Sequence, residues 1–217
     1  MKVEAESGTK NKTKNGKSRA MSAAREVAYL ALGVALVTVC AWITIPVGAI
    51  PVTLQTFAVA LVGALFGAVR GLIAVAVYLL MGLIGIPVFS NFNAGVAALL
   101  GPTGGYLIGF LFSVVIAGIF SALKIKNHIA KTALLYLGLI FGMAVCYFFG
   151  TLWFVTVYNR GSAEAVSVAA ATMLCVVPYL LPDAVKLFFA ALLGVKLKPY
   201  VKFRSKKKCV EDTQPEA

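Results

Sequence analysis

The chain has 217 residues, of which 60% are hydrophobic and 13% are charged, and its mean hydropathy is +0.91. A soluble domain of this length does not need so much apolar surface, so the composition indicates a protein that crosses a membrane several times. The net charge of +12 does not indicate nucleic-acid binding, because seven of the 20 basic residues precede residue 26 and seven follow residue 195, as expected of cytoplasmic flanks next to anionic lipid.

Six apolar segments can be interpreted as membrane spans, each of which needs roughly 20 residues. In chain order they are Val27–Val47, Leu54–Val69, Leu72–Ile86, Tyr106–Leu123, Thr132–Tyr158 and Pro182–Leu197. The second and third are short and are joined by a tight turn at Gly67–Gly71. A further apolar stretch, Ala163–Val177, is expected to lie over or dip into the outer face, with a seventh span as the alternative.

The distribution of Lys and Arg orients the chain, because short cytoplasmic loops are enriched in these residues. With the N-terminus inside, six spans place 18 of the 20 basic residues on the cytoplasmic side. We therefore expect an all-α integral protein of the cell membrane with six transmembrane helices and both termini in the cytoplasm. The expected organisation is a disordered basic tail over residues 1–24, a membrane domain over 25–198 and a second cytoplasmic tail over 199–217.

The segments expected outside the membrane are rich in Gly, Pro, Asn and aromatic residues. They are Pro46–Pro51, Gly85–Gly105 and Tyr158–Leu181. Irregular backbone at membrane depth is tolerated only where protein buries it or where it lines a cavity. A substrate pocket is therefore expected toward the extracellular side.

Two charged residues lie inside an apolar stretch. Of the eight charged side chains between Val27 and Val195, only Asp183 and Lys186 do so. An ionised group in hydrocarbon costs roughly 2.5–3.5 kcal/mol on the insertion scale. Pro182 suits the first position of a helix, which would place Asp183 in the first turn and Lys186 on the same face. The two residues either bind a ligand, as an acceptor for N–H groups and a cation for a carboxylate, or simply pair with one another.

Further candidates precede the second and fourth spans. Gly101-Pro-Thr-Gly-Gly-Tyr106 exposes backbone N–H groups near a helix N-terminus, which suits an anion or a carbonyl, although such a turn can also serve close helix packing alone. The residues expected to accompany Asp183 and Lys186 in substrate binding are Gln55, Asn91, Asn93, Thr103, Gly104 and Tyr106.

Small residues recur at helical spacing in the first span, at Ala24, Ala28, Ala31 and Ala35. Such a face lets another helix approach closely, within this chain or in another. The sequence has no G-x-x-x-x-G-K-[ST], H-E-x-x-H or G-x-S-x-G motif, and its four cysteines lack the spacing of a metal site. We therefore expect no enzymatic activity, no metal and no cofactor.

Four segments carry a resemblance to a known family. They are Pro51-Val-Thr-Leu-Gln55, Gly82-Leu-Ile-Gly-Ile-Pro-Val-Phe89, Gly101-Pro-Thr-Gly-Gly-Tyr-Leu-Ile-Gly-Phe110 and Pro182-Asp-Ala-Val-Lys186. Over roughly residues 25–197 the chain resembles the BioY family, the biotin-specific substrate-binding (S) components of energy-coupling-factor (ECF) transporters. The resemblance implies a six-helix protein that binds biotin from outside and partners a transmembrane coupling protein and two cytoplasmic ATPases. It also implies that Asp183 and Lys186 contact biotin and that Ala28, Ala31 and Ala35 face the coupling protein.

Three functions are compatible with the residues alone. The first is a vitamin-binding transporter subunit without its own energy source. The second is a stand-alone secondary transporter in which Asp183 is a proton-coupled carboxylate, and the third is an assembly protein whose charged pair is only structural. The resemblance favours the first.

Overall fold

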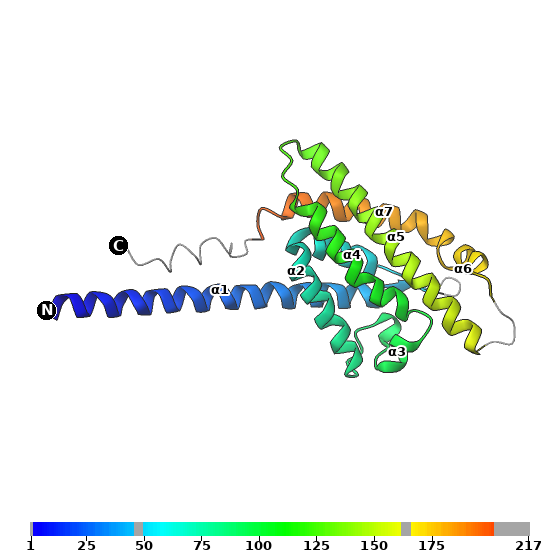
Figure 1. Ribbon diagram of the computed structural model, residues 1–217, viewed down its shortest axis with the longest axis horizontal. Coiled ribbons are helices and arrows are strands. Elements are labelled where there is room, and N and C mark those ends of the chain that lie inside the picture. The colour runs from blue at the N-terminus through cyan, green and yellow to red at the C-terminus, as the bar shows by residue number, and fades with distance from the viewer. Residues whose placement is uncertain (1, 46–49, 162–165, 202–217) are drawn as a thin grey trace.

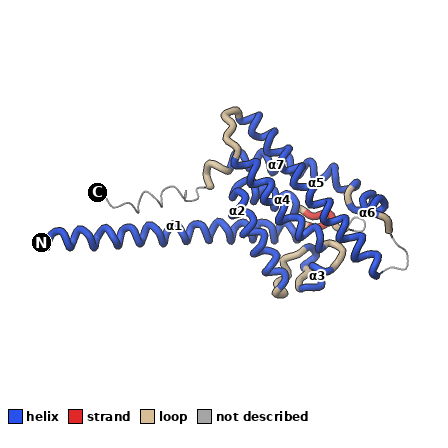
Figure 2. The backbone as a smooth tube through the Cα atoms, viewed as in Figure 1, coloured by secondary structure: helices blue, strands red, loops and turns tan. Residues whose placement is uncertain are grey.

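The computed structural model describes residues 2–45, 50–161 and 166–201. Within these ranges the regular secondary structure is helical apart from one short antiparallel ladder between β1 (Thr44–Ile45) and β2 (Val52–Thr53). The helices are α1 (Lys2–Trp42), α2 (Gln55–Leu83), the 3-10 helix η1 (Ser90–Phe92), α3 (Val96–Leu100), α4 (Gly104–Ala122), α5 (His128–Gly161), α6 (Val168–Cys175) and α7 (Val177–Leu197). The expected all-helical fold is confirmed, and Figure 2 shows the two strands as short red segments among the helices.

The helices form a bundle centred on α2 and α4. Helix α4 packs against α2 on one side and α5 on the other, while α1 and α7 pack against α2. Figure 1 shows that α1 continues far beyond the bundle at its N-terminal end. By length and composition, four described helices can cross a membrane, namely Ala23–Trp42 of α1, α2, α4 and His128–Arg160 of α5, and the bent pair α6–α7 would make a fifth.

Glycines allow α2 and α4 to approach each other closely. A Cβ atom on Gly118 would lie 2.0 Å from the Ala68 nitrogen, and one on Gly63 would lie 2.7 Å from the Ala117 Cβ. Both distances are shorter than real Cβ contacts, so any side chain here would force the helices apart. The helix contact that holds the core together therefore depends on these two positions.

Helix α2 is broken at Gly67, whose φ of 79° and ψ of 177° are not helical. A Cβ atom on Gly71 would lie 3.4 Å from the Gly63 Cα. Residues eight apart on an unbroken helix are about 12 Å apart, so the two halves of α2 fold back on each other. The expected turn between the second and third apolar segments is confirmed, but it occupies one residue, and Arg70 lies in the second half of the helix and not in a loop.

The boundary expected near the N-terminus differs from the structure. Helix α1 begins at Lys2, although residues 1–24 were expected to be a disordered tail. The Lys, Ala and Glu residues of this segment have high helix propensity, which an argument from polarity alone neglects. Of the tail expected over 199–217, residues 202–217 lie outside the described part of the chain.

The start of the last span is also corrected. Helix α7 begins at Val177, so Pro178 occupies the first turn and Pro182 lies inside the helix. The missing N–H of Pro178 costs nothing in the first turn, which makes it the better starting proline. Asp183 is therefore not in the first turn, and the expected stabilisation of its charge by the helix terminus is wrong.

The apolar stretch expected over the outer face contains α6 and is continuous with α7. The two helices meet at Val176 with a bend of 47°. Together they are long and apolar enough to form a broken span or a re-entrant segment. Residues 163–165 of this stretch lie outside the described residues.

Candidate functional site

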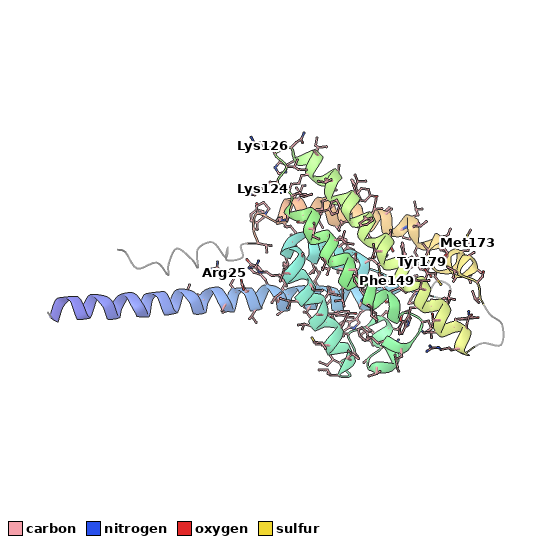
Figure 3. The ribbon with its side chains drawn as sticks, viewed as in Figure 1. Arg25, Lys124, Lys126, Phe149, Met173 and Tyr179 are labelled. Carbon is pink, nitrogen blue, oxygen red and sulfur yellow. The ribbon has the colours of Figure 1, made fainter. Side chains whose placement is uncertain are left out.

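A cavity of about 370 Å³ lies among α2, α4, α5, α7 and the segment that connects α2 to α4. Its volume falls within the roughly 300–1,000 Å³ typical of small-molecule sites. Figure 3 places Tyr179, which lines the cavity, toward the end of the bundle opposite to Lys124 and Lys126. The polar lining residues with side-chain N or O atoms are Thr53, Gln55, Thr56, Ser90, Asn93, Thr103, Tyr106, Tyr147, Tyr179, Asp183 and Lys186.

Asp183 lies in the cavity wall, and its carboxylate is held by residues from three helices. Its Oδ1 accepts a hydrogen bond from the Thr56 hydroxyl at 3.0 Å, and its Oδ2 accepts one from the Tyr147 hydroxyl at 2.5 Å. The Lys186 Nζ lies 2.7 Å from Oδ1. Only 7% of the Asp183 side chain is exposed, so these donors replace the water that burial removes.

Lys186 has a second partner besides Asp183. Its Nζ donates to the Thr53 carbonyl oxygen at 2.7 Å, which connects α7 to β2. An ammonium has three N–H donors, and the acceptors among the described residues use two of them, which leaves one for a ligand. The expected pairing of Asp183 with Lys186 is confirmed, and because both residues also line the cavity, pairing and ligand contact are compatible.

Gln55 is also in the cavity wall, and only 3% of it is exposed. Its Nε2 donates to the Tyr78 hydroxyl at 2.8 Å, and that hydroxyl donates to the Val88 carbonyl oxygen at 3.1 Å. Gln55 begins α2, so this chain of hydrogen bonds ties the start of the helix to its second half and to the segment after it.

The glycine-rich turn before α4 contributes to the cavity with some of its residues. Thr103 and Tyr106 line it, whereas Gly104 does not. A Cβ atom on Gly104 would lie 1.6 Å from the Leu99 carbonyl oxygen, so a glycine is needed there for packing. The Gly101 carbonyl accepts from Trp153 Nε1 at 3.0 Å, which fixes the turn against α5.

The two candidate asparagines have different positions. Asn93 lines the cavity. Asn91 is not among the lining residues; it is exposed and has a φ of 56°, a left-handed conformation that Asn tolerates better than most residues. In this structure, Asn91 shapes the turn and does not face the cavity.

Several lining residues were not predicted from the sequence. Thr56 and Tyr147 hold Asp183, while Phe89, Phe110 and Met143 supply apolar wall. Tyr147 sits within a long apolar segment, and no local pattern marks it as a partner of a residue 36 positions away. The signal is tertiary and could not be found in one sequence.

Aromatic side chains connect the segments around the cavity. Trp42 stacks on Phe92 with ring centroids 5.0 Å apart, and its Nε1 donates to the Pro87 carbonyl oxygen at 2.9 Å. The Tyr179 hydroxyl donates to the Ile50 carbonyl oxygen. These contacts tie the end of α1 to the segment after α2, and α7 to the residues that precede β2.

The small-residue face of α1 is left uncovered by the described part of the chain. Ala28, Ala31 and Ala35 are all exposed. By contrast, Gly63 and Gly71 of α2 are buried and pack close to Val114 of α4. The residues described by the structure include no group of three or more His, Cys, Asp or Glu side chains that could hold a metal ion.

The fold and the cavity together define a helical membrane protein with several apolar helices arranged around a cavity of small-molecule size. Residues 10–203 match the family model of the BioY family, so the chain belongs to this family. The resemblance drawn from the four sequence segments is thereby confirmed.

Three similar proteins illustrate the relationship. A probable biotin transporter BioY of Pyrococcus horikoshii is 36% identical over 175 residues, covering 81% of this chain and 97% of the relative. The biotin transporter BioY of Thermotoga maritima is also 36% identical, over 80% and 96% of the two chains. The crystal structure of the S-component for biotin from an ECF-type ABC transporter superposes with a TM-score of 0.71 at 25% identity, covering 81% of this chain and 92% of that one.

Proposed function

We propose that this protein is the biotin-binding membrane subunit, the S component, of an ECF-type vitamin uptake transporter. The observation that carries the proposal is the Asp183–Lys186 pair in the wall of a cavity of small-molecule size. The names of the similar proteins support biotin as the ligand.

The cavity wall matches the functional groups of biotin. Biotin has a ureido ring with two N–H donors and one carbonyl, an apolar bicycle and a carboxylate on a flexible chain. A carboxylate offers about four acceptor sites, and the three donors that Asp183 has among the described residues leave one site for a ureido N–H. The remaining N–H of Lys186 donates to the ligand carboxylate, and Phe89, Phe110 and Met143 pack on the bicycle.

The other candidate residues divide between contact and support. Gln55, Asn93, Thr103 and Tyr106 line the cavity, so we keep them as contact residues, with an amide or the turn serving the ureido carbonyl. Asn91 and Gly104 act through turn geometry and packing and are not assigned a ligand contact.

The proposal includes six transmembrane helices with both termini in the cytoplasm. The two halves of α2 count as separate helices, because the chain reverses at Gly67. Added to α1, α4, α5 and the α6–α7 pair, they make six. The cavity then lies on the extracellular half of the cell membrane, because Tyr179 in its wall lies toward the end of the bundle opposite to the basic residues Lys124 and Lys126 (Figure 3).

Energy for uptake comes, in this proposal, from a transmembrane coupling protein and two cytoplasmic ATPases. The sequence has no nucleotide-binding loop of its own. Ala28, Ala31 and Ala35 supply the face on which the coupling protein docks, because they are small and exposed.

Reconstituted vesicles provide the test. We expect radiolabelled biotin to enter only when the coupling protein, the ATPases and ATP are present, and to be insensitive to a protonophore. Uptake by the chain alone that a protonophore abolishes would overturn the S-component assignment in favour of a secondary transporter.

A further inference from the structure

We propose that the side-chain oxygen of Gln55 is a hydrogen-bond acceptor of fixed orientation that selects for an N–H group of the ligand, and that Tyr78 sets this orientation. The inference rests on the proposed function, because biotin is the ligand used to examine it. It assigns a specificity-determining atom, Gln55 Oε1, and a positioning residue that does not line the cavity, Tyr78.

The orientation follows from proton counting along the chain of hydrogen bonds. A tyrosine hydroxyl carries one proton, and the Tyr78 proton is donated to the Val88 carbonyl oxygen at 3.1 Å. The Tyr78 oxygen must then accept from its other neighbour, which is Gln55 at 2.8 Å. If the Gln55 amide were reversed, its oxygen would need the Tyr78 hydroxyl proton, and the Val88 carbonyl oxygen would lose its donor. The network therefore places Nε2 on Tyr78 and leaves Oε1 on the other side.

Gln55 Oε1 faces the cavity. No hydrogen bond to this atom is observed among the described residues, yet every fully buried side-chain N or O atom there has a partner. Oε1 is therefore not fully buried, although Gln55 as a whole is only 3% exposed and belongs to the cavity wall. An accessible acceptor on a residue buried to this degree points into the cavity.

Packing keeps the Tyr78 hydroxyl in place. Tyr78 is 0% exposed, and its ring meets the Phe89 ring edge-on, with centroids 5.6 Å apart. Phe89 in turn lies over Gly82, where a Cβ atom would be 2.0 Å from the ring. Tyr78 can neither rotate away nor exchange partners without moving the segment that follows α2.

Gln55 and Asp183 thus present two acceptors from different helices to the same cavity. A cyclic urea has two N–H groups that point in different directions, so one can meet each acceptor. A site built to accept an N–H strongly rejects an isostere that lacks it, because the buried acceptor is left unpaired. Selection for the second N–H is the role that we assign to Gln55.

The experiment uses biotin and its two cyclic carbamate isosteres, in each of which a ring oxygen replaces one ureido N–H. Each ligand is titrated by calorimetry into the detergent-purified full chain, and thermal unfolding shows that each variant is folded. We expect the wild type to bind both carbamates at least about a hundredfold more weakly than biotin. Gln55→Met removes the acceptor and has a similar size. It should reduce the ratio of the carbamate dissociation constant to the biotin dissociation constant to less than about tenfold, for one carbamate only.

Tyr78→Phe is the second variant, since it frees the Gln55 amide to turn. It should relax selection against the same carbamate as Gln55→Met does. The matched control is Tyr158→Phe, which alters an exposed tyrosine outside the cavity and should leave every ratio of dissociation constants unchanged. A general loss of structure would weaken all three ligands in parallel and would not change the ratios.

The outcomes separate the two proposals. Biotin binding by the wild type with unchanged ratios in both Gln55→Met and Tyr78→Phe would overturn the role of Gln55 and leave the proposed function intact. Failure of the wild type to bind biotin would overturn the proposed function and this inference with it.

Discussion

The Tyr147 hydroxyl donates a hydrogen bond of 2.5 Å to Asp183 Oδ2, and this bond joins α5 to α7 in the cavity wall. Thr56 of α2 donates to the other carboxylate oxygen at 3.0 Å. Three helices therefore converge on one buried carboxylate, whose counter-charge is Lys186. This arrangement compensates for the desolvation that makes an isolated ion pair in a membrane costly.

Asp183→Asn should weaken biotin binding at least a hundredfold. The substitution preserves shape but leaves Lys186 as an uncompensated buried charge, a change that typically costs about 3–5 kcal/mol. A tenfold change in affinity corresponds to about 1.4 kcal/mol, so a loss of this size is easily resolved by calorimetry. Unchanged affinity in a folded variant would remove Asp183 from the site.

Tyr147→Phe should weaken binding by about ten- to a hundredfold, because hydrogen bonds to charged groups contribute about 1.5–3 kcal/mol. The phenyl ring keeps the packing, so thermal stability should fall less than in Asp183→Asn. Tyr158→Phe on the same helix is the control and should bind as the wild type does. If Tyr147→Phe bound biotin normally, the hydrogen bond to Asp183 would have no part in recognition.

Gly67→Ala should destabilise the protein by about 1–3 kcal/mol, since a φ of 79° with a ψ of 177° is open essentially to glycine alone. Among the described residues, no atom beyond its neighbours in the helix lies within 4 Å of the added Cβ, so the loss would come from backbone strain and not from a clash. Val69→Ala, at an exposed position two residues on, is the control and should change stability by less than about 0.5 kcal/mol. Equal unfolding temperatures for wild type and Gly67→Ala would argue against the reversal of α2.

Ala31→Leu should abolish ATP-driven uptake while leaving biotin affinity unchanged, because Ala31 is exposed on α1 and does not line the cavity. The larger side chain prevents close approach of another helix. Leu137→Phe enlarges an exposed side chain on α5 and serves as the control, with uptake retained. Normal uptake by Ala31→Leu would exclude this face of α1 as the docking surface.

Lys131→Gln should raise the unfolding temperature at neutral pH. Burial lowers the pKa of Lys198, and the nearby Lys131 charge lowers it further, so the charged form of Lys198 is disfavoured by folding. Such a lysine costs stability at pH values below its folded-state pKa, and the cost fades as the pH rises toward its unfolded-state value. Removal of Lys131 should therefore also flatten the increase of stability with pH in the alkaline range. A lower unfolding temperature would show that Lys131 has a stabilising contact that outweighs the repulsion.

Local patterns predicted the parts of the structure that depend on local interactions. The three-residue spacing alone predicts that Asp183 and Lys186 share one helical face. The distance of 2.7 Å between Lys186 Nζ and Asp183 Oδ1 confirms this prediction. The turn at Gly67 followed from the interruption of an apolar segment by small residues. The start of α7 was misplaced because two prolines compete for the first turn, and polarity alone did not reveal that α1 begins at Lys2.

Residues that act through tertiary contacts could not be predicted. Thr56 and Asp183 are 127 positions apart, and no spacing in the sequence connects them. Tyr78 lies behind the cavity wall and reaches the site only through Gln55. In the glycine-rich turn, the sequence makes Gly104 and Thr103 equally good candidates for ligand contact. Only the structure distinguishes them, because Gly104 packs against Leu99 whereas Thr103 lines the cavity.

The most direct test of the account is calorimetric titration of the detergent-purified chain with biotin, beside thiamine and riboflavin as controls. The account predicts tight one-to-one binding of biotin and no heat from either control. The absence of biotin binding by a chain shown to be folded would contradict it, and would leave the Asp183–Lys186 pair as a structural link between β2, α2, α5 and α7.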